Sequence, residues 1–208
     1  SGGPFRGRKR EELEHIRVED ALKHPNWEMG RKITIDSSTM VNKGLEVIEA
    51  KWLFGVSVDQ IQVVVQPQSI IHSMVEYEDG AVIAQLGTPD MKLPIQYALY
   101  YPERRYLPGD RLDFAELTQI TFEKPDMETF YGLKLAFDAG RKGGSLPTVL
   151  NAANERAVAM FLDRKIKYLQ IPEIIQACME NHKNIADPTV EEILKTEQET
   201  YEFIKNRW

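Results

Sequence analysis

The stretch DSSTMVNKGLE (residues 36–46) gathers polar side chains of several kinds, and a largely apolar run follows it as far as Phe54. A helix beginning at about Ser38 turns by about 100° per residue. With Asn42 set at zero, Lys43 lies near about 100° and Glu46 near about 40°, so the three side chains share one arc. An apolar stripe on the other side consists of Val41, Leu45, Ile48 and Trp52. The stretch therefore predicts an amphipathic helix that docks on a core and projects a polar triplet.

This polar triplet has two interpretations. Ser37 and Ser38 are expected at the amino-terminal end of the helix, where free N–H groups and the helix dipole favour an anion. Hydroxyl, amide and ammonium groups suit a phosphate, whereas Glu46 would repel it unless a cation or a hydroxyl group lay between them, which indicates a metal or a polyhydroxylated substrate. Alternatively, Asp36 or Ser38 caps the helix, and Lys43 and Glu46 form an ordinary surface pair.

Composition narrows the class of protein. The chain has 208 residues, 42% hydrophobic and 28% charged, with a net charge of −6. This balance is typical of a globular protein with a substantial core and gives no indication of a nucleic-acid or membrane partner, since either favours a basic face. Cys178 is the single cysteine, so an intrachain disulfide is excluded, and we expect its thiol to serve packing.

Periodicity and breakers predict a sheet-containing part followed by a helical part. We expect strands at 32–35, 61–67, 70–78 and 81–87, with a hairpin at Asp79-Gly80, and a helix over 89–102. Residues 102–126 have weak periodicity and are expected to form an extended linker. From residue 127 onward, apolar residues recur at three- and four-residue spacing, which predicts a helical bundle.

Two further groups of side chains stand out. His24, Trp27 and Met29 lie in a predicted loop within residues 1–31, where they are candidates for a flexible lid over a ligand; the alternative is a loop anchored to the core by Trp27. Asn151, Asn154 and Glu155 lie on a predicted helix and are expected to make structural polar contacts.

Four segments carry a resemblance to a known family: SGGPFR (1–6), HPNWEMGRKITIDSSTMVNKGLEVIEAKWLF (24–54), QPQSIIHSMVEYEDGAVIAQLGTPDMKLPIQYAL (66–99) and LPTVLNAANERAVAMFL (146–162). Together they resemble the 1-deoxy-D-xylulose 5-phosphate reductoisomerase family. The resemblance implies an α+β fold, in which a small mixed sheet with flanking helices (1–101, the catalytic and dimerisation domain) and the linker precede a C-terminal four-helix bundle (127–208). It also implies a reaction of the non-mevalonate isoprenoid pathway: isomerisation of 1-deoxy-D-xylulose 5-phosphate and NADPH-dependent reduction to 2-C-methyl-D-erythritol 4-phosphate, with Mg²⁺ or Mn²⁺.

The resemblance also assigns roles to residues. Glu46 corresponds to one of three carboxylate metal ligands and neighbours the substrate hydroxyls, and His24 corresponds to a loop histidine that closes on the substrate. Trp27 and Met29 correspond to lid residues, and Gly30, beside Met29, lies where the nicotinamide cofactor approaches. The implied phosphate-binding set is Ser1, Ser37, Asn42 and Lys43.

The chain departs from the family pattern in one large respect. The family's N-terminal NADPH-binding domain and the acidic motif with the other two metal ligands have no counterpart in these 208 residues. We therefore expect a polypeptide of these 208 residues alone to hold metal weakly and to lack activity. The alternatives are a non-catalytic, dimerising phosphate-binding fragment and, more remotely, a Lys43-dependent aldolase. The resemblance further implies a homodimer and a bacterial cytoplasmic location, with a plastid as the alternative.

Overall fold

The computed structural model describes residues 3–25, 27 and 29–208, and these fall into two compact units. One unit comprises Val64–Glu123 together with Trp27, and the other comprises 3–25, Met29–Val63 and Lys124–Trp208. The predicted division at residues 101 and 127 refers to the domains of the family and stays a prediction.

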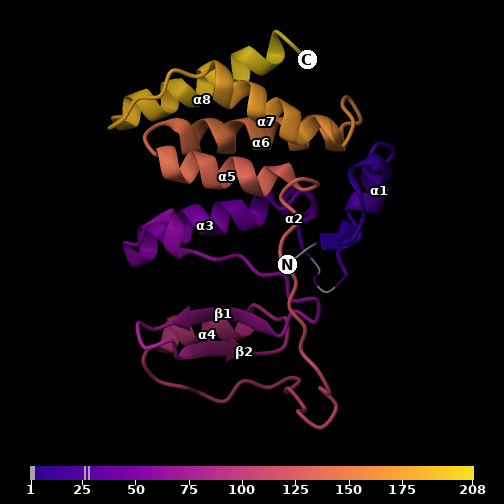
Figure 1. Ribbon diagram of the computed structural model, residues 1–208, viewed down its shortest axis with the longest axis vertical. Helices are drawn as coiled ribbons and strands as arrows, with labels where there is room; N and C mark the ends of the chain where they lie inside the picture. The colour runs from indigo at the N-terminus through magenta and orange to yellow at the C-terminus, as the bar shows by residue number, and fades with distance from the viewer. Residues whose placement is uncertain (1–2, 26, 28) are drawn as a thin grey trace. The chain divides into compact units, whose positions relative to one another are not determined.

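The smaller unit is built on an antiparallel hairpin (Figure 1). Strand β1 (Ile71–Glu76) pairs with β2 (Val82–Leu86), and Tyr77 and Ala81 close the turn around Gly80, where φ is 83°. The predicted hairpin at Asp79-Gly80 is therefore confirmed. Helix α4 (Lys92–Tyr100) follows, as expected for 89–102. The expected strand at 61–67 is reduced to a single bridge between Val65 and Glu123.

The larger unit is built from helices joined by loops, and none of its described residues lies in a strand (Figure 1). Helix α6 is central, because it packs against α5, α7 and α8 and buries apolar side chains on several sides. Cys178 is buried in α7, as expected for a packing residue. The elements of the larger unit are the 3₁₀ turns η1 (Gly3–Phe5), η2 (Arg10–Leu13) and η3 (Val58–Gln60), and the helices α1 (Val18–Ala21), α2 (Arg31–Ser38), α3 (Val41–Phe54), α5 (Tyr131–Lys142), α6 (Leu146–Leu162), α7 (Gln170–Asn181) and α8 (Val190–Lys205).

The α+β class is confirmed, with two corrections to its parts. The sheet of the described residues has two antiparallel strands and is smaller than the expected mixed sheet. Residues 32–35 form part of helix α2 and not a strand: Thr34 Oγ1 donates to the Gly30 carbonyl, and Lys32 pairs with Asp36 one turn later. Such i,i+4 contacts need a helical turn and would not form in a strand, and burial of Ile35 in the core favours the helix over the strand preference of the two isoleucines.

Helix α3 docks on α5 through small residues. A Cβ built on Gly44 would collide with the Ala136 side chain, and one built on Gly132 would come within 2.6 Å of Val41 Cγ2. Glycine at these positions permits the two helix backbones to approach closely, so α5 fixes the position of α3. Among the helices that the structure describes, none has both the length and the apolar character needed to cross a membrane.

Candidate functional site

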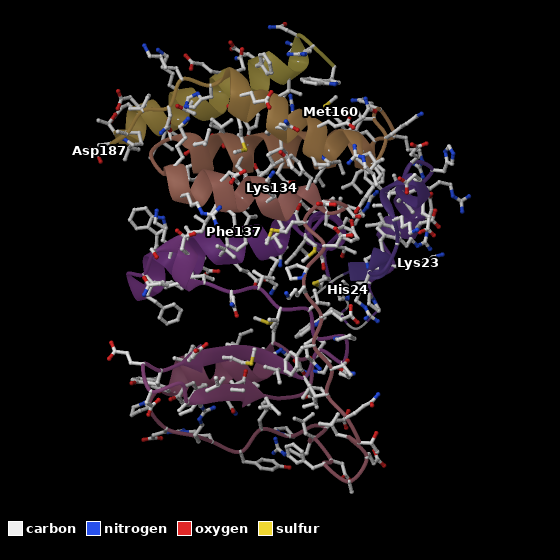
Figure 2. All side chains as sticks on the ribbon, viewed as in Figure 1. Lys23, His24, Lys134, Phe137, Met160 and Asp187 are labelled. Carbon is white, nitrogen blue, oxygen red and sulfur yellow. The ribbon has the colours of Figure 1, made fainter. Side chains whose placement is uncertain are left out.

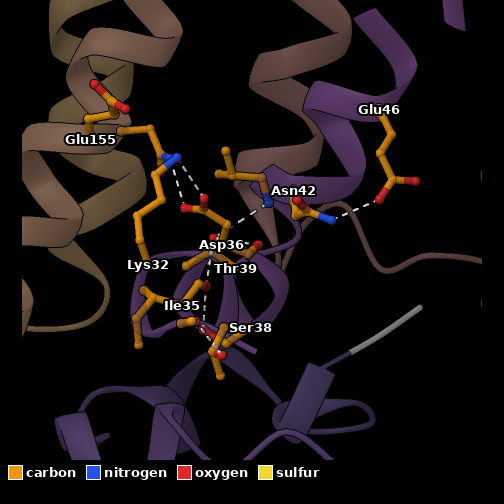
Figure 3. Close-up of polar contacts among 12 residues, drawn as sticks. Lys32, Ile35, Asp36, Ser38, Thr39, Asn42, Glu46 and Glu155 are labelled. Carbon is orange, nitrogen blue, oxygen red and sulfur yellow. Dashed lines mark hydrogen bonds and ion pairs between the residues drawn. The ribbon is translucent and has the colours of Figure 1, made fainter. Parts of the chain in front are cut away.

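The candidate site lies where α2 ends and α3 begins (Figure 3). The two helices are joined through Met40, whose φ of 61° is left-handed and whose side chain is buried. A positive φ is unfavourable for a residue with a long side chain, so the surrounding core must hold this corner in place. The predicted helix start at Ser38 is therefore wrong, because α3 begins at Val41.

The predicted arc of polar side chains is present on the first turns of α3. Asn42 Nδ2 donates to Glu46 Oε1 at 2.8 Å, and Lys43 Nζ lies 2.6 Å from Glu46 Oε2 (Figure 3 shows the first of these contacts). The Lys43 side chain is 29% exposed and that of Glu46 is 45% exposed. An amide, an ammonium and a carboxylate thus converge at a helix start that remains accessible to a ligand.

The capping interpretation of this stretch is wrong. Ser38 Oγ is buried and donates back to the Ile35 carbonyl at 2.7 Å, and the Asp36 carboxylate is directed away to other partners. Neither side chain caps α3, whose preceding residue is Met40. The surface-pair interpretation of Lys43 and Glu46 describes the contact correctly, but it leaves the third member of the arc, Asn42, unexplained.

Ser37 occupies the last turn of α2, and not the helix start at which we expected it. Its carbonyl oxygen accepts a hydrogen bond from Met40 N at 3.3 Å, and its side chain is half-buried. The free N–H groups that could meet an anion therefore belong to the first turn of α3, with Asn42 and Lys43, because the four leading N–H groups of a helix lack intrahelical acceptors.

The predicted lid residues are placed in different parts of the chain. His24 follows α1 and is half-buried (Figure 2), and this burial lowers the pKa of its imidazole, which favours the neutral ring. Trp27 belongs to the smaller unit, where its Nε1 donates to Ser69 Oγ at 3.1 Å and its ring meets His72 edge to face. Ser1, the remaining predicted phosphate ligand, lies outside the described residues.

Gly30 and Met29, the predicted cofactor contacts, stand at the start of α2. Gly30 is the exposed residue that precedes the helix, and a Cβ built on it meets no atom within 4 Å. Met29 is half-buried beside it. The Gly30 backbone is therefore accessible, and the cofactor contact at these two positions stays a prediction.

Glu46 fits the role of one metal ligand but not of a complete site. Each of its oxygens accepts one hydrogen bond and keeps capacity for a cation. Within the part of the chain that the structure describes, no group of three His, Cys, Asp or Glu side chains is arranged to hold a metal ion. A hard divalent cation takes six or more oxygen ligands, so further ligands must come from elsewhere.

The sequence did not reveal what holds this corner. Asp36 is buried, forms an ion pair with Lys32 Nζ at 2.8 Å and accepts a hydrogen bond from Asn154 Nδ2 at 2.8 Å. The Tyr168 hydroxyl donates to the Ser38 carbonyl at 2.7 Å. Asn154 was expected to make a structural contact, but its partner lies 118 positions away in the chain. The i,i+4 spacing of Lys32 and Asp36 was the one local signal of this network.

Comparison with known proteins finds similar sequences over the whole chain. Residues 86–203 match the family model described as the DXP reductoisomerase C-terminal domain, and residues 1–54 match that of the 1-deoxy-D-xylulose 5-phosphate reductoisomerase C-terminal domain. Proteins named 1-deoxy-D-xylulose 5-phosphate reductoisomerase from Lachnospira eligens and Agathobacter rectalis are 70% and 72% identical over 208 residues. These alignments cover 100% of this chain and 55% of each relative, so the chain spans about half their length.

Solved structures agree with the sequence comparison. A DOX-P reductoisomerase in complex with NADPH, fosmidomycin and magnesium has a TM-score of 0.93 at 43% identity, over 99% of this chain and 52% of that one. A Zymomonas mobilis 1-deoxy-D-xylulose 5-phosphate reductoisomerase in complex with NADPH has a TM-score of 0.88 at 45% identity, over 96% of this chain and 51% of that one.

Proposed function

Because the chain belongs to the 1-deoxy-D-xylulose 5-phosphate reductoisomerase family, we propose that it forms the substrate-binding part of an enzyme that isomerises this sugar phosphate and reduces it with NADPH. The observation that carries the proposal is the convergence of Asn42, Lys43 and Glu46 on the first turns of α3. One helix thereby offers phosphate-binding groups and a metal-ligating carboxylate at a fixed separation, which orients the reacting carbons relative to the phosphate.

Each side chain has a distinct task in this proposal. The Lys43 ammonium and the Asn42 amide bind the phosphate, with Ser37 and Ser1 completing the set. Glu46 supplies one ligand to Mg²⁺ or Mn²⁺. When bound, the cation polarises the carbonyl of the substrate, and NADPH supplies the hydride. His24 contacts the substrate, Trp27 and Met29 exclude water, and Gly30 leaves room for the nicotinamide.

Two alternatives make different predictions. A non-catalytic phosphate-binding fragment would use Asn42 and Lys43 but would have no need of Glu46 as a metal ligand. An aldolase would need a desolvated, uncharged lysine, whereas Lys43 is ion-paired with Glu46 at 2.6 Å and partly exposed, which does not favour this chemistry. Borohydride trapping with a keto-sugar phosphate should accordingly leave Lys43 unmodified.

Kinetics of the full-length protein that contains these residues test the proposal. Lys43→Ala removes a charged hydrogen bond worth roughly 1.5–3 kcal/mol, so KM for the substrate should rise by more than about tenfold. Glu46→Gln should instead lower kcat and change the dependence on divalent metal. Lys124→Ala and Glu49→Gln are matched controls, since both residues are exposed. Unchanged kcat and metal dependence in Glu46→Gln would contradict the ligand assignment.

The remaining assignments concern assembly and location. A homodimer formed through the hairpin is supported by its exposed apolar side chains, among them Val75, Val82 and Ile83. Sedimentation of the full-length protein checks this, and a monomer at micromolar concentration would contradict it. The bacterial relatives favour the bacterial cytoplasm over a plastid.

A further inference from the structure

The turn that carries Ser37 is held by contacts from the distant helical part of the same unit. Asn154 lies on α6 and donates to the Asp36 carboxylate at 2.8 Å, and Tyr168, which precedes α7, donates to the Ser38 carbonyl at 2.7 Å. Asp36 and Ser38 are the immediate neighbours of Ser37 on its two sides. Both contacts are buried, so solvent does not compete for either of them.

Burial of the Asn154 amide is unfavourable in free energy, which indicates a role other than packing. Its side chain is fully buried, and within the described part of the chain its Oδ1 has no hydrogen-bond partner. A buried amide with one unsatisfied atom is less stabilising than an apolar side chain of the same size. What the amide does supply is a second partner for the Asp36 carboxylate, whose other partner, Lys32, belongs to the same helix α2. Asn154 is thus the side-chain tether that joins this carboxylate to α6.

The connection between α2 and α3 couples the Asn154 contact to the proposed phosphate-binding residues. The Thr39 hydroxyl lies 3.3 Å from the Ile35 carbonyl oxygen and 3.2 Å from that of Asp36 (Figure 3). Met40 N donates to the Ser37 carbonyl. The connection between the two helices is therefore short and hydrogen-bonded. A displacement of the end of α2 therefore moves Ser37 and the first turn of α3 together. Glu46 lies a turn further along, where α5 supports the helix at Gly44.

We infer that Asn154 and Tyr168 are positioning residues that set the phosphate-binding segment 37–43 from the helical part of the chain. This inference rests on the proposed function, because it concerns the same phosphate. Neither side chain is assigned a contact with substrate, metal or cofactor. Each acts through the residue that flanks Ser37, and the effect is expected in substrate binding more than in the chemical step.

The test compares Asn154→Ala with Asn151→Ala in the full-length enzyme. Asn151 lies on the same helix and makes no side-chain hydrogen bond among the described residues, so it is a control for the substitution itself. Asn154→Ala should raise KM for 1-deoxy-D-xylulose 5-phosphate about tenfold, the equivalent of one hydrogen bond, and leave kcat within about threefold. Simple loss of folded enzyme lowers apparent kcat and leaves KM unchanged, so the two causes are separable.

Tyr168→Phe provides the second arm if Asn154→Ala does not fold. It removes one hydroxyl and keeps the ring that packs edge to face against Phe5 and Phe161. The control is Tyr201→Phe, whose hydroxyl contacts glutamates on α6 and α8. A KM raised by at least about threefold in Tyr168→Phe and unchanged in Tyr201→Phe supports the inference. A KM within twofold of wild type in every folded Asn154 and Tyr168 variant overturns it.

Lys43→Ala separates the two levels of the argument. If Lys43→Ala raises KM and the Asn154 and Tyr168 variants do not, the positioning role is wrong and the phosphate site stands. If Lys43→Ala leaves KM unchanged, the proposed function has failed at this helix, whatever the other variants show.

Discussion

At the scale of single residues, Glu46 and the proposed phosphate compete for one ammonium group, that of Lys43. Lys43 is neutralised by Glu46, yet the proposed phosphate needs the same positive charge. A cation bound at Glu46 removes this competition, because it takes over the carboxylate and releases the ammonium. The Asn42 amide is also engaged by Glu46, because it donates a hydrogen bond to the carboxylate. If the proposed function holds, a cation at Glu46 and a phosphate at Lys43 should therefore assist each other's binding.

This competition predicts that one substitution in the proposed site strengthens the binding of phosphate. In the full-length protein with divalent cations removed by a chelator, Glu46→Gln should bind inorganic phosphate about two- to fivefold more tightly than wild type, because it removes a repelling charge and frees Lys43 from a partly exposed ion pair. Isothermal titration calorimetry measures the affinity, with Glu49→Gln as the control on the same helix. Equal or weaker binding by Glu46→Gln would show that Lys43 and Glu46 do not compete for the phosphate.

At the scale of secondary structure, local sequence signals succeeded where one helix or hairpin accounts for its own pattern. The hairpin at Asp79-Gly80 and the helices after residue 127 have strong turn signals or long apolar periodicities. Two of the failures share a cause. Residues 32–35 alternate like a strand, and Ser38 looks like a cap, but burial of Ile35 and Ser38 in the tertiary core decides both in favour of a helix that ends at Ser38.

The same limit applies to the candidate site. The arc of Asn42, Lys43 and Glu46 follows from the helical repeat alone, so it could be predicted. The tethers from Asn154 and Tyr168 could not, because nothing local in the sequence relates either residue to a partner more than a hundred positions away. The side chains of α3 that we propose to bind a ligand are neighbours in sequence, whereas Asn154 on α6 and Tyr168 ahead of α7 come from distant parts of the chain.

The contact between α3 and α5 predicts a large effect from one added methyl group. Gly44→Ala places a Cβ against the Ala136 side chain, so the helices must separate. Overpacking of this kind costs about 1–3 kcal/mol, which exceeds the gain of about 1 kcal/mol in helix propensity. We expect Gly44→Ala to lower the free energy of unfolding of the full-length protein in urea. Ala136→Gly in the same chain should restore part of the loss, and a Gly44→Ala variant as stable as wild type would contradict this packing.

At the scale of the whole molecule, the proposed phosphate binding and the stability of the fold depend on the same unit. The helical part that buries most of the core also carries the tethers of the phosphate-binding segment, so it contributes to binding without a proposed ligand contact of its own. The proposed metal site differs, because Glu46 is the one ligand that we assign to it among the described residues, which form no metal-binding cluster. We therefore expect these residues alone to bind a divalent metal ion only weakly.

A polypeptide made of residues 1–208 and nothing else should consequently bind phosphate better than it binds metal. With one carboxylate in place of the several oxygen ligands that Mg²⁺ or Mn²⁺ requires, we expect a dissociation constant above about 1 mM for either ion, and no turnover with NADPH and substrate. Circular dichroism establishes that the helices are formed before calorimetry with each ion, and Glu46→Gln in the same polypeptide shows how much of any binding belongs to this carboxylate. Micromolar binding of Mg²⁺, or turnover at the rate of the full-length enzyme, would mean that residues 1–208 hold a complete metal site, and that the remaining ligands lie among side chains to which we assign other roles.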